Sequence, residues 1–172
     1  YGPAQGVKPV EIRAITEDRH GTVWVGTTGD GLYRFEHGSF TIISTKDGLV
    51  RDVIQSIYED VEGHIWLGTQ DGGLVQLRVG PFTSYTTADG LPRDWVRPIH
   101  EDASGGIWVG TDRGLARFTD GRFVVHAAQD GRPYGNVTGI SEDRTGNLWI
   151  HTYRASPAGN VVPRGEHPPR AD

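Results

Sequence analysis

The stretch EDVEGHIWLGTQDGGL (59–74) decides the fold, because close copies of it recur along the chain. The copies read EDRHGTVWVGTTGDGL (17–32), EDASGGIWVGTDRGL (101–115) and EDRTGNLWI (142–150). Their tryptophans stand 42, 42 and 41 residues apart, and four copies in register predict a repeat protein. The repeat is marked by an Asp, a Gly and a Trp in constant phase: Asp18, Gly21, Trp24; Asp60, Gly63, Trp66; Asp102, Gly105, Trp108; Asp143, Gly146, Trp149.

One repeat contains four segments with the composition of short strands. In the second copy they cover residues 53–58, 64–69, 74–79 and 82–86. The junctions between them contain Asp60 and Gly63, and then Asp71-Gly72-Gly73, which supply the positive φ angles of tight turns. A unit of about 42 residues with four strands is typical of a β-propeller blade.

The phase of the repeats divides the chain into blades. We predict an all-β fold, a β-propeller segment with about three full four-stranded blades plus half a fourth, too short to close an ordinary ring. The fourth copy departs from the pattern at His151, which stands where the others have Gly. The predicted units are the end of a preceding blade (1–10), blade 1 (11–52), blade 2 (53–94), blade 3 (95–135), a partial blade 4 (136–152) and a Pro-rich, disordered tail (153–172).

Composition excludes several classes of protein. The chain has 172 residues and a net charge of −5 without basic blocks, so it lacks the electrostatic surface that binds nucleic acid. The absence of Cys from the sequence excludes disulfides and thiolate metal sites. The absence of Met, even at position 1, indicates a processed or excised piece. The 25 Gly residues fit a chain with many tight turns.

The Glu-Asp pair of each copy invites comparison with the two carboxylates of glycosidases. The pair recurs at the same predicted hairpin, however, and an Asp three residues before a Gly suits a type I turn by accepting backbone N–H bonds. We therefore interpret the pairs as structural, place the four repeat tryptophans in the core, and predict no catalytic residue. The seven His residues lack metal-ligand spacing, so neither a metal nor another cofactor is predicted.

Positions that differ between copies at the same phase are free to specialise. Several of them flank or line the first strand of each blade, which lies innermost in propellers. The richest local group among them is Trp95, Arg97 and His100, an aromatic ring, a cation and a titratable ring within six residues. We predict that these three residues bind a ligand together with Arg13 and Tyr58, which stand at the phases of Arg97 and His100 in other copies. An aromatic ring beside cations suits an acidic oligosaccharide or another anion. The competing interpretation is a solvated surface with one Trp between blades.

The pattern ED-x-x-G-x-[IVL]-W-[IVL]-G-T followed by G-L resembles the two-component regulator propeller repeat over about residues 6–152. The resemblance implies a ligand-sensing propeller in the periplasmic or extracellular part of an inner-membrane protein. It also implies that the signal passes to a histidine kinase output domain that this chain lacks. The implied partner is an unknown small ligand or oligosaccharide, and contact with the membrane is made only through the parent protein.

Two further functions stay open on the sequence alone. An incomplete propeller exposes a sheet edge, so the chain would serve as a structural or interaction module that self-associates or joins the remaining blades of a longer chain. A propeller lyase or hydrolase is disfavoured, because no catalytic group departs from the repeat.

Overall fold

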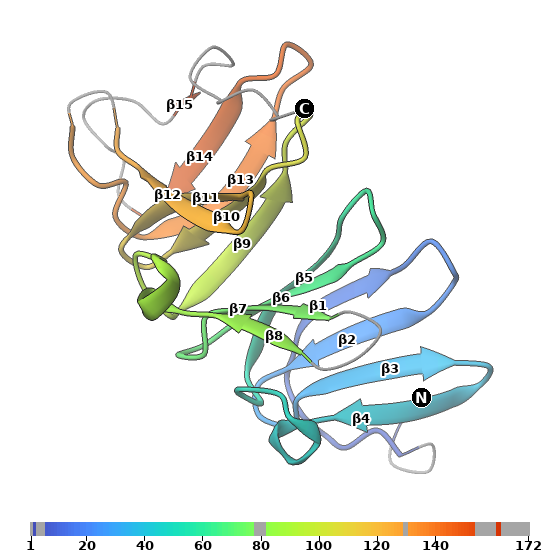
Figure 1. The fold of residues 1–172 in the computed structure, drawn as a ribbon. Coiled ribbons are helices and arrows are strands. Elements are labelled where there is room, and N and C mark those ends of the chain that lie inside the picture. The colour runs from blue at the N-terminus through green and yellow to red at the C-terminus, as the bar shows by residue number, and fades with distance from the viewer. Residues whose placement is uncertain (1, 3–5, 78–81, 129–130, 154–160, 163–172) are drawn as a thin grey trace.

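The computed structural model describes residues 2, 6–77, 82–128, 131–153 and 161–162. These residues form four antiparallel sheets that follow one another along the chain (Figure 1). In three sheets, four strands are joined in chain order. Among the described residues, no helix is long and apolar enough to cross a membrane.

Each sheet is one blade, and the blades are numbered in chain order. Short 3-10 helices precede blades 2 and 3 as η2 (Thr45–Asp47) and η3 (Thr87–Asp89). The strands of blades 1 and 2 are β1 (Ile12–Glu17), β2 (Val23–Thr27), β3 (Leu32–Glu36), β4 (Ser39–Ile43), β5 (Ile54–Glu59), β6 (Ile65–Thr69), β7 (Leu74–Leu77) and β8 (Thr83–Tyr85). Those of blades 3 and 4 are β9 (Val96–Glu101), β10 (Ile107–Thr111), β11 (Gly114–Thr119), β12 (Arg122–His126), β13 (Val137–Glu142), β14 (Leu148–Thr152) and β15 (Val161–Val162).

The predicted fold class is confirmed: three four-stranded blades and an incomplete fourth, with no closed ring among the described residues. One detail differs from the prediction, since β15 lies inside the tail predicted over 153–172. Its two residues pair with Leu148 and Trp149 of β14, so the fourth sheet has a third, short strand. Most of that predicted tail (154–160 and 163–172), and residues 78 and 79 of the strand predicted over 74–79, lie outside the described residues.

Consecutive blades pack face to face, and the repeat Trp lies at the interface with the following blade. Trp24 of β2 packs with Ile65 and Leu67 of β6. The same relation recurs twice, for Trp66 with Ile107 and Val109, and for Trp108 with Leu148 and Ile150. The prediction of a core position is wrong for Trp149. Its side chain is 49% exposed, because no further blade among the described residues covers it.

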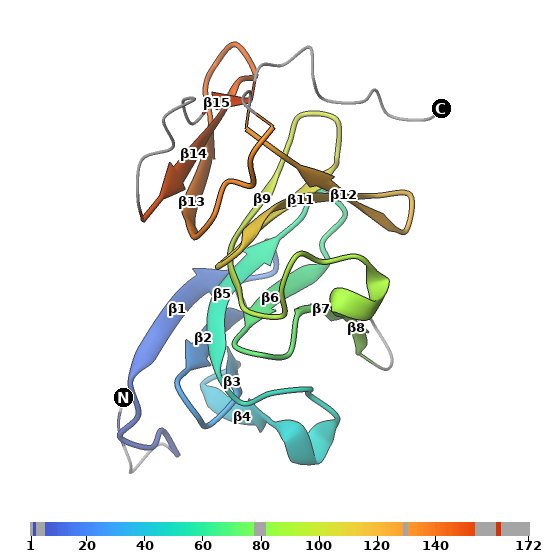
Figure 2. The same cartoon turned by 90° about the vertical axis from the view of Figure 1, so that its left-hand side faces the viewer.

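The first strands β1, β5, β9 and β13 lie side by side, as the innermost strands of a propeller do (Figure 2). In blades 1 to 3 the Gly two residues after the Trp permits this approach, since a Cβ on Gly26 would lie 2.7 Å from Cγ2 of Ile54. A Cβ on Gly110 would lie 2.6 Å from Cγ1 of Val137 in the same way. Blade 4 has the exposed His151 at this position, where no described blade approaches.

Candidate functional site

A hairpin carboxylate holds each blade together and accounts for the recurring Asp. Asp18 Oδ1 accepts the backbone N–H groups of His20 and Thr22, each at 2.9 Å. Its Oδ2 accepts the indole N–H of Trp24 at 2.8 Å. The same indole bond joins Trp66 to Asp60 (2.8 Å), Trp108 to Asp102 (2.7 Å) and Trp149 to Asp143 (3.1 Å). Sequence reasoning anticipated the backbone bonds and missed the indole bond, which fixes the Asp-to-Trp spacing.

Blade 3 adds a buried cation to this hairpin. Arg117 Nε donates to Asp102 Oδ2 at 2.7 Å, and both side chains are only 1% exposed. Gly106 leaves the room, because a Cβ there would lie 2.2 Å from Arg117 Cζ. Burial by itself raises the pKa of Asp102, but hydrogen bonds from Arg117, Ser104 and Trp108 outweigh burial and hold that pKa well below its usual range.

The Glu of the second and third pairs connects its blade to the preceding one. The backbone N–H of Arg19 donates to Glu59 Oε2 at 3.0 Å, and that of Val61 donates to Glu101 Oε2 at 2.7 Å. The Arg19 side chain also pairs with Glu59 at 2.5 Å. The donor and acceptor residues lie 40 positions apart in the sequence, so no local sequence pattern predicts these bonds. Both members of the Glu-Asp pair therefore bind the scaffold itself.

A pocket of about 650 Å³ lies against the first strands of all four blades, and we call it the channel pocket. Three of the five predicted ligand-binding residues, Arg13, Trp95 and Arg97, line it. The remaining lining residues are Gln55, Ser56, Gln70, Pro98 and Thr138. The described lining carries two Arg and no acidic side chain, so its formal charge is positive although the chain is acidic.

Polar groups in the channel pocket point to a recognition surface. The guanidinium carbon of Arg97 lies 4.7 Å from the ring centroid of Trp95, a cation–π arrangement that orients both side chains. Arg97 also donates to Asn136 Oδ1 at 3.2 Å. Two buried polar atoms of residues that line this pocket, Trp95 Nε1 and Ser56 Oγ, have no hydrogen-bond partner among the described residues. Buried donors without partners are rare in folded proteins.

The other two predicted ligand-binding residues lie elsewhere. Tyr58 and His100 do not line the channel pocket; their rings lie 6.5 Å apart between blades 2 and 3. His100 Nε2 faces Glu142 Oε2 at 3.3 Å. Burial raises the pKa of Tyr58. Sequence reasoning grouped the five because they are close in phase, but the structure separates Arg13, Trp95 and Arg97 from Tyr58 and His100.

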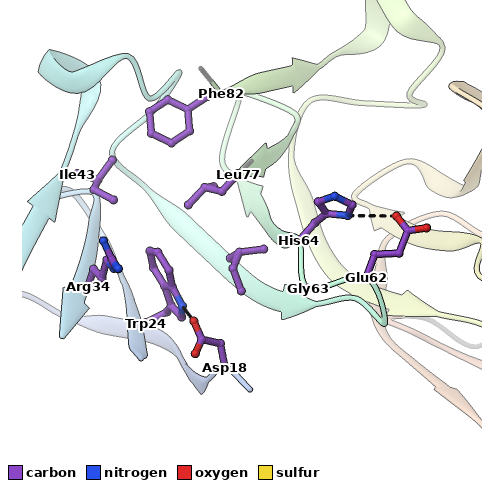
Figure 3. Close-up of a pocket in the computed structure, with 10 residues that line it drawn as sticks. Asp18, Trp24, Arg34, Ile43, Glu62, Gly63, His64, Leu77 and Phe82 are labelled. Atoms are coloured by element: carbon purple, nitrogen blue, oxygen red, sulfur yellow. Dashed lines mark hydrogen bonds and ion pairs between the residues drawn. The ribbon is translucent and has the colours of Figure 1, made fainter. Parts of the chain in front are cut away.

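A second hollow, which sequence reasoning missed, lies between blades 1 and 2. We call it the rim pocket; its volume is about 680 Å³ (Figure 3). It is lined by Asp18, Trp24, Arg34, Ile43, Glu62, Gly63, His64, Ile65, Leu77 and Phe82. Figure 3 shows the apolar side chains around a common space, with Arg34 on one side and the Glu62–His64 pair on the other.

One cluster of metal-ligand residue types adjoins the rim pocket. The ligand atoms of Asp60, Glu62 and His64 lie within 4.8 Å of one another. Asp60 Oδ2 already accepts the indole N–H of Trp66, and His64 Nδ1 lies 3.0 Å from the same oxygen. We therefore interpret these residues as part of the hairpin that holds blade 2.

The stacked sheets and the charged pocket along their first strands define the chain as a β-propeller segment with a candidate recognition site. The chain belongs to the two component regulator propeller family, whose profile matches residues 6–29, 41–71, 90–113 and 131–154. No curated protein matches the chain in sequence.

Solved structures of low sequence identity share the fold. The extracellular domain of BT3049 from B. thetaiotaomicron, assigned as a hybrid two component system, superimposes with a TM-score of 0.73 at 23% identity, covering 87% of this chain and 21% of that one. The extracellular domain of BT4673 from B. thetaiotaomicron, assigned as a one component system, gives 0.72 at 23% identity, covering 89% and 24%. Virginiamycin B lyase from Staphylococcus aureus gives 0.69 at 17% identity, covering 90% and 55%.

The chain spans about a fifth to a quarter of the length of the two extracellular domains. At these identities the likeness shows the fold alone, for the lyase as for the two extracellular domains.

Proposed function

We propose that this chain is a ligand-binding segment of the sensor region of a two-component signal-transduction protein, and that the channel pocket binds the ligand. The observation that carries the proposal is that Arg13, Trp95 and Arg97, chosen because they break the repeat, line one pocket. Support for the sensor context comes from the family to which the chain belongs. The ligand lies outside the cytoplasm in this proposal, and a kinase-type output domain receives the signal.

The electrostatics of the channel pocket favour an anion. Two guanidinium groups in the lining attract negative charge; of the two, only Arg13 forms an ion pair with a described residue, Glu11, at 3.3 Å. Guanidinium groups bind carboxylates and phosphates through paired hydrogen bonds. The Trp95 ring adds an apolar face on which a sugar ring can stack, so an acidic oligosaccharide uses both features.

Trigalacturonate, an acidic trisaccharide, tests the proposal against the neutral trisaccharide maltotriose. We expect calorimetric titration of the full chain to detect trigalacturonate, with an affinity that falls as salt is raised because the charges are partly exposed. Replacing Arg97 with Gln should weaken binding about tenfold or more, the effect of one lost charge-assisted bond.

Arg122→Gln is the matched control, because Arg122 is exposed on β12 and does not line the channel pocket. This variant should bind trigalacturonate as the parent chain does. Equal affinity for maltotriose, or unchanged affinity after Arg97→Gln, would contradict an anion site in the channel pocket.

A second function, as an interaction module, is favoured by the exposed faces of the end blades. Ile15 on β1 is 63% exposed and Trp149 on β14 is 49% exposed, whereas Ile57, at the position equivalent to Ile15, packs against the core. We propose that a second copy of this chain covers these exposed faces. Any such contact must differ from blade-on-blade packing, because His151 replaces the Gly that lets the next first strand approach.

Sedimentation velocity tests self-association directly. We expect the chain to form dimers or larger species as its concentration rises, and Trp149→Glu to shift the distribution toward monomer, because a charge opposes burial of that face. Arg122→Gln again serves as the neutral control. A parent chain that stays monomeric over the whole concentration range excludes this function.

A further inference from the structure

The rim pocket has a smaller counterpart at the next interface, and the comparison explains its size. Between blades 2 and 3 the equivalent hollow is lined by Trp66, Ile107 and Phe118, among others, and its volume is about 170 Å³. The rim pocket between blades 1 and 2 measures about 680 Å³. The two interfaces are copies of the same repeat, so the difference must come from the side chains that differ.

Two substitutions within the repeat open the rim pocket. Leu77 pairs with Ile65 as Phe118 pairs with Ile107, so Leu replaces Phe at this position. Ile43 pairs with Leu32 as Tyr85 pairs with Leu74, so Ile replaces Tyr as well.

At the filled interface between blades 2 and 3, the larger rings occupy this space. The ring centroids of Tyr85 and Phe118 lie 4.7 Å apart, and those of Trp66 and Phe118 lie 5.6 Å apart. The interface between blades 1 and 2 has no such pair at these positions, and its apolar floor stays open to solvent. A volume of this size lies in the range of about 300–1,000 Å³ typical of small-ligand sites.

A buried donor lies beside this floor. Arg34 pairs with Trp24 across β2 and β3, as Arg117 pairs with Trp108 in blade 3. Arg117 Nε donates to Asp102, whereas Arg34 Nε is buried and has no hydrogen-bond partner among the described residues. A buried N–H group without an acceptor is costly, and because the Arg34 side chain is 41% exposed, a rotation of that side chain would bring the group to a ligand oxygen.

The charges around the rim pocket select the ligand class. Its lining holds one cation, Arg34, two carboxylates, Asp18 and Glu62, and the imidazole of His64, so the formal charge with His neutral is negative. Arg34 is itself neutralised by Glu36, at 2.5 Å. An anion is therefore repelled, and an uncharged acceptor suits Arg34 Nε best.

We propose that the rim pocket binds a small uncharged molecule with an aromatic or similar apolar body and a carbonyl or hydroxyl oxygen that accepts from Arg34. The apolar body of the ligand lies on Ile43, Leu77 and Phe82. It fills the space that the rings of Tyr85 and Phe118 fill at the interface between blades 2 and 3. This site is separate from the channel pocket, and its proposal does not depend on the anion site there.

Benzamide is a suitable probe, because it has a phenyl ring, a carbonyl acceptor and no charge. We expect it to shift the methyl resonances of Ile43, Ile65 and Leu77 in the full chain at millimolar concentrations, as befits so small a ligand. The methyl groups of Leu115 and Ile150, in the core between blades 3 and 4, should not move. Benzoate has the same shape but carries a charge, and its affinity should be lower than that of benzamide by a factor of about ten or more.

Two variants locate the site. Ile43→Tyr combined with Leu77→Phe fills the rim pocket with the residues of the next interface and should abolish the shift at Ile65. If this double variant does not fold, Arg34→Gln decides: it introduces the residue type of Gln76, its blade 2 counterpart, and should weaken benzamide about tenfold. Arg122→Gln is the control and should change nothing.

Three results overturn the proposal. The first is the absence of shifts at Ile43, Ile65 and Leu77 with millimolar benzamide. The second is unchanged binding in Arg34→Gln or in a folded Ile43→Tyr/Leu77→Phe variant. The third is benzoate binding as tightly as benzamide, which removes the assignment to an uncharged ligand.

Discussion

Replacing Asp102 with Asn is expected to lower the free energy of unfolding by about 3–5 kcal/mol, the usual cost of removing one partner of a buried ion pair. The variant keeps the shape of the side chain but removes the charge that compensates Arg117. Arg117 is 1% exposed and cannot reach water without opening the interface between blades 3 and 4. Chemical denaturation monitored by Trp fluorescence measures the change.

A double variant isolates the ion pair from the other bonds of Asp102. If the cost of Asp102→Asn comes from the uncompensated cation, adding Arg117→Met should recover part of the lost stability, because the buried charge is then gone. A single variant that loses less than about 1 kcal/mol would instead mean that Arg117 is solvated in the native protein.

The pKa of Asp102 also predicts how this effect depends on pH. Because the folded-state pKa is lowered, the stabilisation is fully present above the unfolded-state pKa, near 3.8, and is lost as pH falls through the folded-state pKa. The difference in stability between the parent chain and Asp102→Asn should therefore be constant near neutral pH and shrink on acidification below about pH 4. A difference that grows on acidification would contradict the assignment.

The blade architecture could be predicted from the sequence because each of its determinants recurs. The Asp60 turn and the Trp66 strand are local patterns, and repetition in register separates them from chance. The Gly after each Trp was visible as a marker, but its cause was not: it makes room for the first strand of the next blade, as Gly26 does for Ile54.

The candidate site was predicted only in part, because the position of a residue within the repeat does not determine which side chains line the same pocket. Arg13 and Arg97 lie at the same phase in blades 1 and 3, and both line the channel pocket. His100 stands three residues after Arg97 and pairs with Glu142 of the next blade instead. These positions depend on the register of the first strand β9 against β10, and this register shifts at a bulge between Val109 and Thr111 of β10. No sequence pattern predicts this bulge.

The rim pocket was invisible for a different reason. Its size depends on Ile43 from one blade and Leu77 from the next, and each is an ordinary apolar strand residue in its own context. Only their combination across an interface, compared with Tyr85 and Phe118, shows that volume is missing. Comparison of repeats by the interface they form, rather than by the blade they belong to, would have exposed it.

Trp66 and Trp149 occupy the same position in two copies of the repeat, and replacing each with Ala should have unequal effects. Trp66 is 3% exposed, donates to Asp60, and packs against Phe118 between blades 2 and 3. Trp66→Ala leaves a cavity there and deprives a buried carboxylate of a donor. We expect a loss of about 3–5 kcal/mol in the free energy of unfolding, the range for buried Trp.

Trp149→Ala serves as the matched control, because that ring is 49% exposed and has no following blade to pack against among the described residues. It should cost less than about 1.5 kcal/mol, since removal of a half-exposed side chain forfeits only part of the burial term. Urea denaturation of both variants at neutral pH compares them directly. Equal losses at the two positions would contradict the conclusion that packing on the following blade, rather than the indole bond to the hairpin Asp, is the main contribution of the repeat Trp.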